Sequence, residues 1–175
     1  MSERDPCPVL YGRLVTLEPL VAAHAADLYP LLSDSELWRY EDDGAPRSAV
    51  ALKARYAAWQ TRRSPDGTQR WLNWAVRVPP QGIVGNVQAT VYDDSVEAAV
   101  GYMLGRRFWS NGWGTDAVGA VIAHLRDGLR LRRVLAVVDD RNAASVRLLE
   151  KLGFALDDSS DRRNLVFVLP LAPPR

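Results

Sequence analysis

The spacing of apolar residues changes several times along the chain, and each change predicts a new element of secondary structure. In residues 12–20, GRLVTLEPL, the apolar side chains of Val15 and Leu17 alternate with polar ones, a pattern typical of a strand. From residue 20 to residue 32 the apolar residues recur at helical spacing. Pro30 removes a backbone donor from this helix, so we expect its last turn to be broken.

A second helix, three strands and a third helix are predicted next. Ser48 is suited to cap the second helix, whose apolar face would be formed by Leu52, Tyr56 and Trp59. Three strand-like runs follow, separated by turns of hairpin length, and they cover residues 70–78, 82–92 and 96–104. The third helix follows the segment SNGWGT, and its apolar stripe would consist of Val118, Ile122, Leu125 and Leu129.

The last part of the chain predicts short strands around one more helix. The run RRVLAVV, residues 132–138, is typical of a short buried strand. In residues 141–154, RNAASVRLLEKLGF, Asn142 is positioned to cap a helix and Gly153 to end it in a left-handed conformation. The segments FALDD and NLVFVLPL complete the chain as a predicted hairpin.

The predicted order of elements is β-α-α-β-β-β-α-β-α-β-β, which mixes hairpins with crossover connections. Such an order predicts an α/β fold with a mixed sheet and helices on both of its faces. The chain has 175 residues and no repeat, low-complexity tract or dividing linker. We therefore expect one domain over residues 1–175, in which residues 1–8 form a loose tail.

Composition and charge narrow the functions that this fold can carry. Hydrophobic residues make up 47% of the chain, charged residues make up 25%, and the net charge of +1 gives no reason to expect nucleic acid or an anionic membrane as partner. Cys7 is the only cysteine, and His24 and His124 are the only histidines, so we expect no internal disulfide and no metal site. No stretch has the character of a signal peptide or a membrane span, which predicts a cytoplasmic location.

Gly112 and Gly114 stand at the start of the third helix. A helix N-terminus has backbone N–H groups without partners, and glycine lets the backbone approach a ligand, so this segment suits a diphosphate. Two other interpretations remain open. The glycines can form a simple turn, or, with Ala117, they match the G-x-G-x-x-A pattern of dinucleotide-binding enzymes. Against the second, GRRFWSN separates the glycines from the preceding strand, and hairpins rather than βαβ units lie upstream.

The paired segments GYMLGRRFWSNGWGTDAVGAVIAHL and NAASVRLLEKLGF resemble the GNAT superfamily of N-acetyltransferases, and in particular its RimJ/RimL-type branch of ribosomal-protein N-terminal acetyltransferases. The resemblance covers nearly the whole chain. It implies a GNAT-like domain with a mixed, mostly antiparallel sheet. In that fold two central parallel strands splay apart around acetyl-coenzyme A, and the resemblance implies them at residues 100–104 and 134–138.

The resemblance also implies which residues hold acetyl-coenzyme A. Its pantetheine arm would pair with the strand edge near Met103 and Leu104, and Asn142 would form a hydrogen bond with the same arm. Its pyrophosphate would accept hydrogen bonds from the backbone of the loop formed by Asn111, Gly112, Trp113, Gly114 and Thr115.

Acetyl transfer needs a neutral amine and a proton for the departing sulfur. Many family members carry a tyrosine acid where this chain has Leu149, whereas the RimJ/RimL-type branch uses a serine that matches Ser145. Ser145 can alternatively support the helix cap. A glutamate common in the family is replaced by Ala99, and Glu97, on the same side of a regular strand, is either the base or an exposed turn residue.

The resemblance implies a primary amine as acceptor, either the α-amine of a peptide or protein N-terminus or a small molecule. The acidic run of Glu41, Asp42 and Asp43 would attract a cationic amine, or is simply solvated. The candidate walls of the acceptor groove are all aromatic, although aromatic residues at alternate strand positions are also typical of a core: Trp38, Tyr40, Trp71, Trp74 and Tyr92.

Two other classes of function stay open at this point. One is an enzyme that binds a nicotinamide dinucleotide, and the other is a catalytically silent module that binds acyl-coenzyme A, because the family's glutamate and tyrosine are both replaced. Exposed aromatic residues are also compatible with a homodimer.

Overall fold

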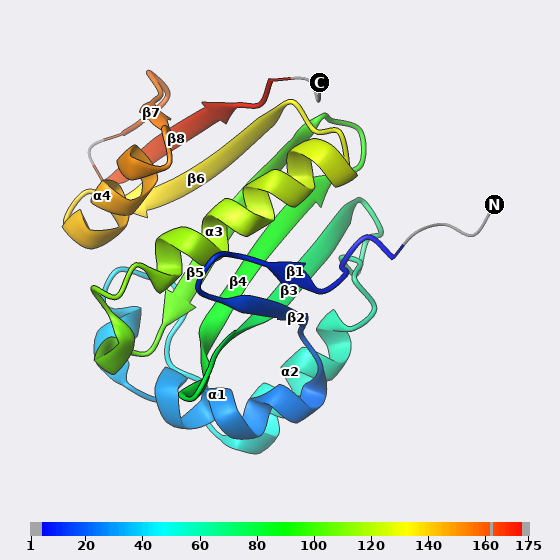
Figure 1. Cartoon of the computed structure of the whole chain (residues 1–175), viewed down its shortest axis with the longest axis vertical. Coiled ribbons are helices and arrows are strands. Elements are labelled where there is room, and N and C mark those ends of the chain that lie inside the picture. Colours follow the sequence, from blue (N-terminus) through cyan, green and yellow to red (C-terminus); the bar gives the residue numbers. More distant parts are fainter. Residues whose placement is uncertain (1–4, 162, 173–175) are drawn as a thin grey trace.

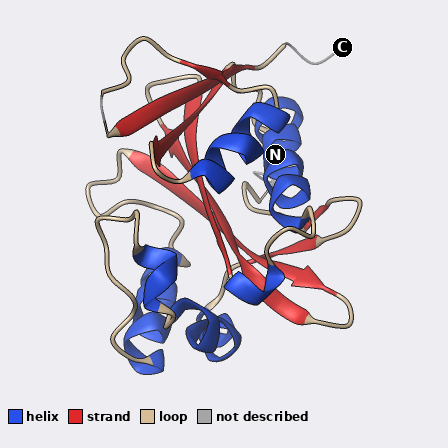
Figure 2. Ribbon diagram, turned by 90° about the vertical axis from the view of Figure 1, so that its left-hand side faces the viewer, coloured by secondary structure: helices blue, strands red, loops and turns tan. Residues whose placement is uncertain are grey.

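One mixed sheet of eight strands forms the centre of the computed structural model, which describes residues 5–161 and 163–172 (Figure 1). The strand order is β1-β2-β3-β4-β5-β6-β8-β7, and all neighbouring strands are antiparallel except β5 and β6. Helices α1 and α2 cover one face of the sheet, and α3 and α4 cover the other (Figures 1 and 2). The predicted fold class is therefore confirmed.

The elements follow the predicted order, with one added strand at the start. The strands are β1 (Leu10–Tyr11), β2 (Thr16–Pro19), β3 (Gln69–Val78), β4 (Gly82–Tyr92), β5 (Glu97–Leu104), β6 (Arg133–Asp139), β7 (Ala155–Leu156) and β8 (Asn164–Pro170). The α-helices are α1 (Ala25–Leu32), α2 (Ala49–Trp59), α3 (Trp113–Ala123) and α4 (Ala143–Lys151). Short 3-10 helices cover Ala22–His24, Ser35–Trp38 and Arg106–Phe108, and a π-helical turn at His124–Gly128 continues α3.

The caps of two helices are the predicted ones. Ser48 Oγ accepts a hydrogen bond from the N–H of Ala51 at the start of α2. Asn142 Oδ1 accepts one from the N–H of Ser145 at the start of α4, and Gly153 after α4 has a φ of +87°. The local side-chain chemistry therefore sets where these helices begin and end.

The expected break of the first helix at Pro30 is wrong. Helix α1 continues through Leu32 although Pro30 lies inside it. The carbonyl that loses its partner belongs to Ala26, which is exposed and can bond to water instead. Leu31 and Leu32 are both buried, and this burial holds the last turn in place.

The expectation of a fully buried β6 is also wrong. Val134, Ala136 and Val138 are buried, but Val137 between them is 62% exposed. The strand thus alternates between the two faces of the sheet, and only one of these faces is covered there.

The predicted loose tail is packed against the core as far as the structure describes it; residues 1–4 lie outside the described residues. Cys7 is buried, and its thiol donates to the carbonyl of Asn73. Burial raises the pKa of Cys7 to about 12, which keeps the thiol protonated. The carbonyl of Pro8 accepts a hydrogen bond from Trp74 Nε1 at 2.8 Å. These contacts fix residues 5–8 over the start of the sheet.

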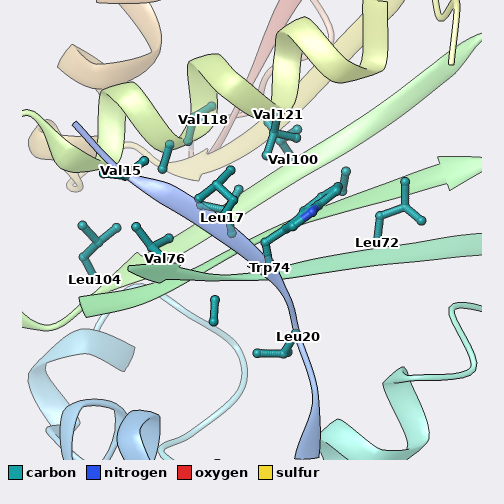
Figure 3. Close-up of a cluster of buried hydrophobic side chains, with 14 of the residues drawn as sticks. Val15, Leu17, Leu20, Leu72, Trp74, Val76, Val100, Leu104, Val118 and Val121 are labelled. Carbon is teal, nitrogen blue, oxygen red and sulfur yellow. The ribbon is translucent and has the colours of Figure 1, made fainter. Parts of the chain in front are cut away.

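Helix α3 packs its apolar stripe on the sheet and forms the main core with it. Val118, Ile122 and Leu125 are buried as predicted, and Leu129 is partly buried. Figure 3 shows Val118 and Val121 above side chains from β3 and β5, including Trp74 and Val100. No helix within the described residues is long and apolar enough to cross a membrane.

Asp116, in the first turn of α3, holds the turn between β1 and β2. Its carboxylate accepts hydrogen bonds from the N–H groups of Arg13, Leu14 and Val15 at 3.0, 2.7 and 3.1 Å. We expect Asp116→Ala to lower the free energy of unfolding by about 1–2 kcal/mol, because water can replace part of these bonds at an exposed turn. Urea unfolding measures this. Asp127→Ala, which removes an exposed partner of Arg126 only, is the control, and an equal effect of both variants would contradict the role given to Asp116.

Candidate functional site

Strands β5 and β6 separate along their length, so their facing edges have no strand partner beyond Ala99 and Leu135. They pair only at Glu97–Arg133, Ala98–Val134 and Ala99–Leu135. Beyond Ala99, β5 continues to Leu104 beside β4, while β6 continues beside β8 (Figure 1). The edge of β5 that includes Met103 and Leu104 therefore carries backbone groups that no strand pairs, as the splayed pair requires.

The loop after β5 presents a run of backbone donors close to this split. The six N–H groups of residues 110–115 have no hydrogen-bond acceptor among the described residues, and no side chain caps α3. Ser110 and Gly112 have φ values of +62° and +78°, and the Asn111 side chain fastens the loop to the carbonyls of Phe108 and Trp109. Such a run of unpartnered donors at a helix N-terminus is suited to an anion.

The two glycines of this loop have different structural roles. Gly112 is the left-handed N-cap of α3, and nothing lies within 4 Å of the place where a Cβ would stand. At Gly114 a Cβ would lie 3.2 Å from Leu148 Cδ1 and 3.7 Å from Leu104 Cδ1. Gly114 therefore lets α4 pack closely on the start of α3, whereas Gly112 shapes the ring of donors.

The first turn of α4 lies beside β5 and carries the candidate proton donor. The N–H of Ser145 is bonded to Asn142 Oδ1 at 3.2 Å, and Ser145 Oγ has no hydrogen-bond partner among the described residues. The alternative role of Ser145 Oγ in capping is therefore not seen, because the Asn142 side chain makes the cap. Ser145 Oγ is left free to bind a ligand group.

Tyr102 is a residue that the sequence analysis missed. It lies on β5, and its hydroxyl donates to the carbonyl of Ser145 at 3.4 Å. Burial raises the pKa of Tyr102, and this outweighs the lowering by its hydrogen bond to Ser145, so the phenol stays protonated. The signal in the sequence was the tyrosine directly after Gly101, at a position on the same side of the strand as Leu104.

The candidate base, Glu97, lies where β5 and β6 are still paired. Its carboxylate accepts a hydrogen bond from Arg133 Nη1 at 3.0 Å. It is two residues before Ala99, which corresponds to about 7 Å along a strand. This geometry favours a structural ion pair. Leu149, at the position where many family members have a tyrosine, is fully buried and takes no part in the site.

The loop that carries Tyr40 and the acidic run of residues 41–43 lies against the turn between β6 and α4. The Tyr40 ring has the guanidinium carbons of Arg39 and Arg141 at 5.9 and 5.5 Å from its centroid. Arg141 is in turn bonded to Asp139 at the end of β6. Desolvation of its carboxyl raises the pKa of Glu41, and the charges of the two following aspartates raise it further. The loop thus brings negative charge to the same side of the molecule as Asn142.

Four of the five aromatic residues considered as walls of the acceptor groove are not brought together. Trp74 is wholly buried in the core beneath α3, so it cannot contact a substrate (Figure 3). Trp38 is half-buried, and its indole N–H is bonded to the carbonyl of Leu32. Tyr40 has two arginines close to its ring, and Tyr92 lies at the end of β4 opposite Gln69. The assignment of Trp74 to the groove is therefore wrong, and the other three are spread over different elements.

A cavity of about 270 Å³ lies instead between α2 and the middle of the sheet. It includes Trp71, one of the aromatic residues considered above. Its lining residues come from α2, β3 and β4: Trp59, Gln69, Trp71, Asn73, Gln88, Ala89 and Thr90. The sequence signal was the polar residues at alternate positions of two neighbouring strands, which place their side chains on one face.

Comparisons with known proteins agree with this geometry. The family model described as Acetyltransferase (GNAT) domain matches residues 14–155. The chain is 33% identical over 146 residues to the uncharacterized N-acetyltransferase p20 of Bacillus licheniformis, covering 83% of this chain and 81% of that protein.

Two solved structures share the fold. The GNAT-family acetyltransferase from Bacillus anthracis has a TM-score of 0.77 at 13% identity and covers 93% of this chain and 98% of its own. Mycobacterium smegmatis RimJ in complex with CoA-disulfide has a TM-score of 0.78 at 18% identity and covers 93% of this chain and 85% of its own. The dinucleotide-binding alternative does not hold, because β3, β4 and β5 before the glycine loop are antiparallel neighbours rather than part of a βαβ unit. The chain belongs to the GNAT family of acetyl-coenzyme A-dependent N-acetyltransferases, in its RimJ/RimL-like branch.

Proposed function

We propose that this protein transfers the acetyl group of acetyl-coenzyme A to the primary amine of a peptide N-terminus or a small molecule. The observation that carries the proposal is the split between β5 and β6, beside which six N–H groups of the loop have no acceptor within residues 5–161 and 163–172. A free strand edge suits an extended amide-containing chain, and a ring of donors suits a diphosphate. Acetyl-coenzyme A offers both features in one molecule.

Different residues of the chain bind different parts of the coenzyme. The backbone from Asn111 to Thr115, through Gly112, Trp113 and Gly114, donates to the pyrophosphate. At Met103 and Leu104 the pantetheine amides pair with the backbone groups of β5 that remain open, since the Leu104 carbonyl already accepts a hydrogen bond from Trp109 Nε1 at 2.8 Å. Asn142 uses Oδ1 for its helix cap, and its Nδ2 has no acceptor among the described residues, so this group donates to the same arm.

The reaction needs little base catalysis if the acceptor is a weakly basic amine. At pH 7, neutralising an α-amine with a pKa of about 8 costs roughly 1.4 kcal/mol, whereas a lysine amine with a pKa of about 10.4 costs roughly 4.6 kcal/mol. Once neutral, the amine attacks the acetyl carbon, a C–N bond forms and the C–S bond breaks. Ser145 Oγ donates a hydrogen bond to the departing sulfur, and the proton lost by the amine passes to water.

Glu97 is the alternative proton acceptor, but its carboxylate forms an ion pair with Arg133. A base at this position would have to leave Arg133 before accepting a proton. We expect Glu97→Gln to change kcat/KM by less than about threefold, within the range of a lost surface ion pair. Steady-state rates across a pH series measure this. A large loss of kcat/KM at neutral pH would identify Glu97 as the base instead.

The coenzyme site is tested by adding charge to the donor loop with Thr115→Glu. Thr115 is in the first turn of α3, where a carboxylate stabilises a helix by about 0.3–1 kcal/mol. The same carboxylate repels the diphosphate by about 1–2 kcal/mol at close range, which is about tenfold in Kd. We therefore expect a higher melting temperature of the free protein together with weaker binding of coenzyme A. Thermal unfolding and calorimetric titration measure the two effects.

Thr115→Gln is the control because it has the same shape without the charge. If the glutamate and glutamine variants bind coenzyme A equally well, the diphosphate does not lie at this loop. Acetylation of an amine panel tests the activity itself. Binding of acetyl-coenzyme A without turnover of any amine would favour a silent module over a transferase.

A further inference from the structure

The cavity beside α2 is lined by uncharged residues, so its lining offers no charged side chain to pair with a charged ligand. Its walls are the half-buried indoles of Trp59 and Trp71, and its polar groups are the side chains of Gln69, Asn73, Gln88 and Thr90. None of the lining residues is charged. Its volume of about 270 Å³ is just below the range of about 300–1,000 Å³ for whole drug-sized ligands, so it suits a single ring or side chain.

The cavity lies next to the place where β5 leaves β6. Gln88 on β4 is opposite Gly101, and Thr90 is opposite Ala99, the last residue of β5 that pairs with β6. A Cβ on Gly101 would lie 3.0 Å from Gln88 Nε2, so the Gln88 side chain covers β5 at this point. Neighbouring strands are about 5 Å apart, so the cavity begins about one strand spacing from the split.

Two side-chain amides that line the cavity, those of Asn73 and Gln88, have donor or acceptor atoms without a hydrogen-bond partner among the described residues. Asn73 is only 8% exposed, and its Nδ2 donates to the carbonyl of Trp71 at 3.3 Å, but its Oδ1 has no donor among the described residues. The side chain of Gln88 has no partner among them either. Trp71 Nε1 is already bonded to Gln69 Oε1 at 2.9 Å, so Trp71 offers its ring face. The only buried side-chain N or O atom without a partner among the described residues is Arg70 Nε, so Asn73 Oδ1 is accessible and can accept a hydrogen bond from water or a ligand.

We propose that this cavity binds an uncharged planar group attached to the acceptor amine, either an aromatic ring or a carboxamide. This inference rests on the proposed function, because it assigns the acceptor specificity of the same site. A planar group packs against the indoles that line the cavity, and a carboxamide or ring N–H pairs with Asn73 Oδ1. A carboxylate or a second ammonium is disfavoured because it would lose part of its hydration and find no opposite charge among the lining residues.

Acceptor selectivity is the first test. The rates of acetyl transfer are compared for phenylethylamine, for tripeptides that begin with Phe or Gln, and for charged acceptors, namely spermidine and tripeptides that begin with Glu or Lys. We expect kcat/KM to be at least about tenfold higher for the uncharged acceptors. Preference for phenylethylamine over the peptides identifies a small-molecule acceptor, and the reverse identifies a peptide N-terminus. Equal rates with charged and uncharged acceptors overturn the proposal.

The variants Trp71→Ala and Asn73→Leu connect this selectivity to the cavity. We expect Trp71→Ala to remove the advantage of the aromatic acceptors and Asn73→Leu to remove that of the carboxamide, while the affinity for coenzyme A is retained. Tyr11→Ala, which removes an exposed aromatic side chain on β1, is the control and should leave selectivity unchanged. Retained selectivity in both cavity variants places the specificity elsewhere and overturns the proposal.

A binding measurement tests the cavity independently of acetyl transfer. The indole N–H signals of the protein are followed by NMR while N-acetylphenylethylamine, the uncharged product of one test reaction, is titrated without coenzyme. Shifts of the Trp59 and Trp71 signals support the cavity even if no amine is turned over. Unchanged signals at millimolar ligand overturn it even if acetyl transfer occurs.

Discussion

Replacing Trp74 with alanine is expected to lower the free energy of unfolding by about 3–5 kcal/mol, the range for truncating a large buried aromatic side chain. Trp74 is fully buried, and its indole meets the His124 ring edge-on at a centroid distance of 6.1 Å. Its N–H also holds the carbonyl of Pro8, so the variant loosens the N-terminal segment as well. Acceptor selectivity should not change, because this side chain faces α3 rather than the cavity.

Trp71→Ala is the matched comparison, since it truncates the same residue type three positions earlier on the same strand. Trp71 is half-buried and lines the cavity, so its loss should affect acceptor selectivity much more than stability. Urea unfolding of both variants, combined with the acceptor panel, separates the two roles. A Trp74→Ala protein of nearly unchanged stability, or one with altered selectivity, would contradict the assignment of Trp74 to the core.

The parts of the fold that the sequence predicts well are those set by local chemistry. Ser48 and Asn142 cap their helices because a short polar side chain reaches the N–H three residues ahead, and this spacing is visible in the sequence. The three central strands are equally visible, because turns of hairpin length separate runs of strand-forming residues. The start of α3 is also visible, because Gly112 stands directly before a helical pattern and is its left-handed N-cap.

The parts that the sequence does not predict depend on contacts between distant segments. Residues 5–8 looked like a tail, but Pro8 is fixed by Trp74, which is 66 positions away. The period of two along a strand places Trp71 and Trp74 on opposite faces, yet it does not tell which face is the core. Glu97 looked available as a base because nothing local shows that Arg133 would lie beside it.

The proton donor is the catalytic assignment with the largest expected effect on activity. Ser145→Ala removes the hydroxyl without disturbing the helix cap, which uses the backbone N–H of Ser145. We expect kcat to fall by about 100-fold, the lower end of the contribution of a positioned proton donor, with little change in the Kd of coenzyme A. Ser145→Thr, which keeps a hydroxyl, should restore most of the lost rate, whereas a purely structural role would not depend on the hydroxyl.

Tyr102 is expected to act as a positioning residue, because its hydroxyl holds the carbonyl of Ser145 and so orients the first turn of α4. Tyr102→Phe should lower kcat by less than Ser145→Ala does, and the double variant should be no slower than Ser145→Ala alone, since both changes act through one hydroxyl. The pH dependence of kcat adds a second criterion. A loss larger for Tyr102→Phe than for Ser145→Ala, together with disappearance of an alkaline limb from the pH profile, would identify the phenol itself as the donor and leave Ser145 with a structural role.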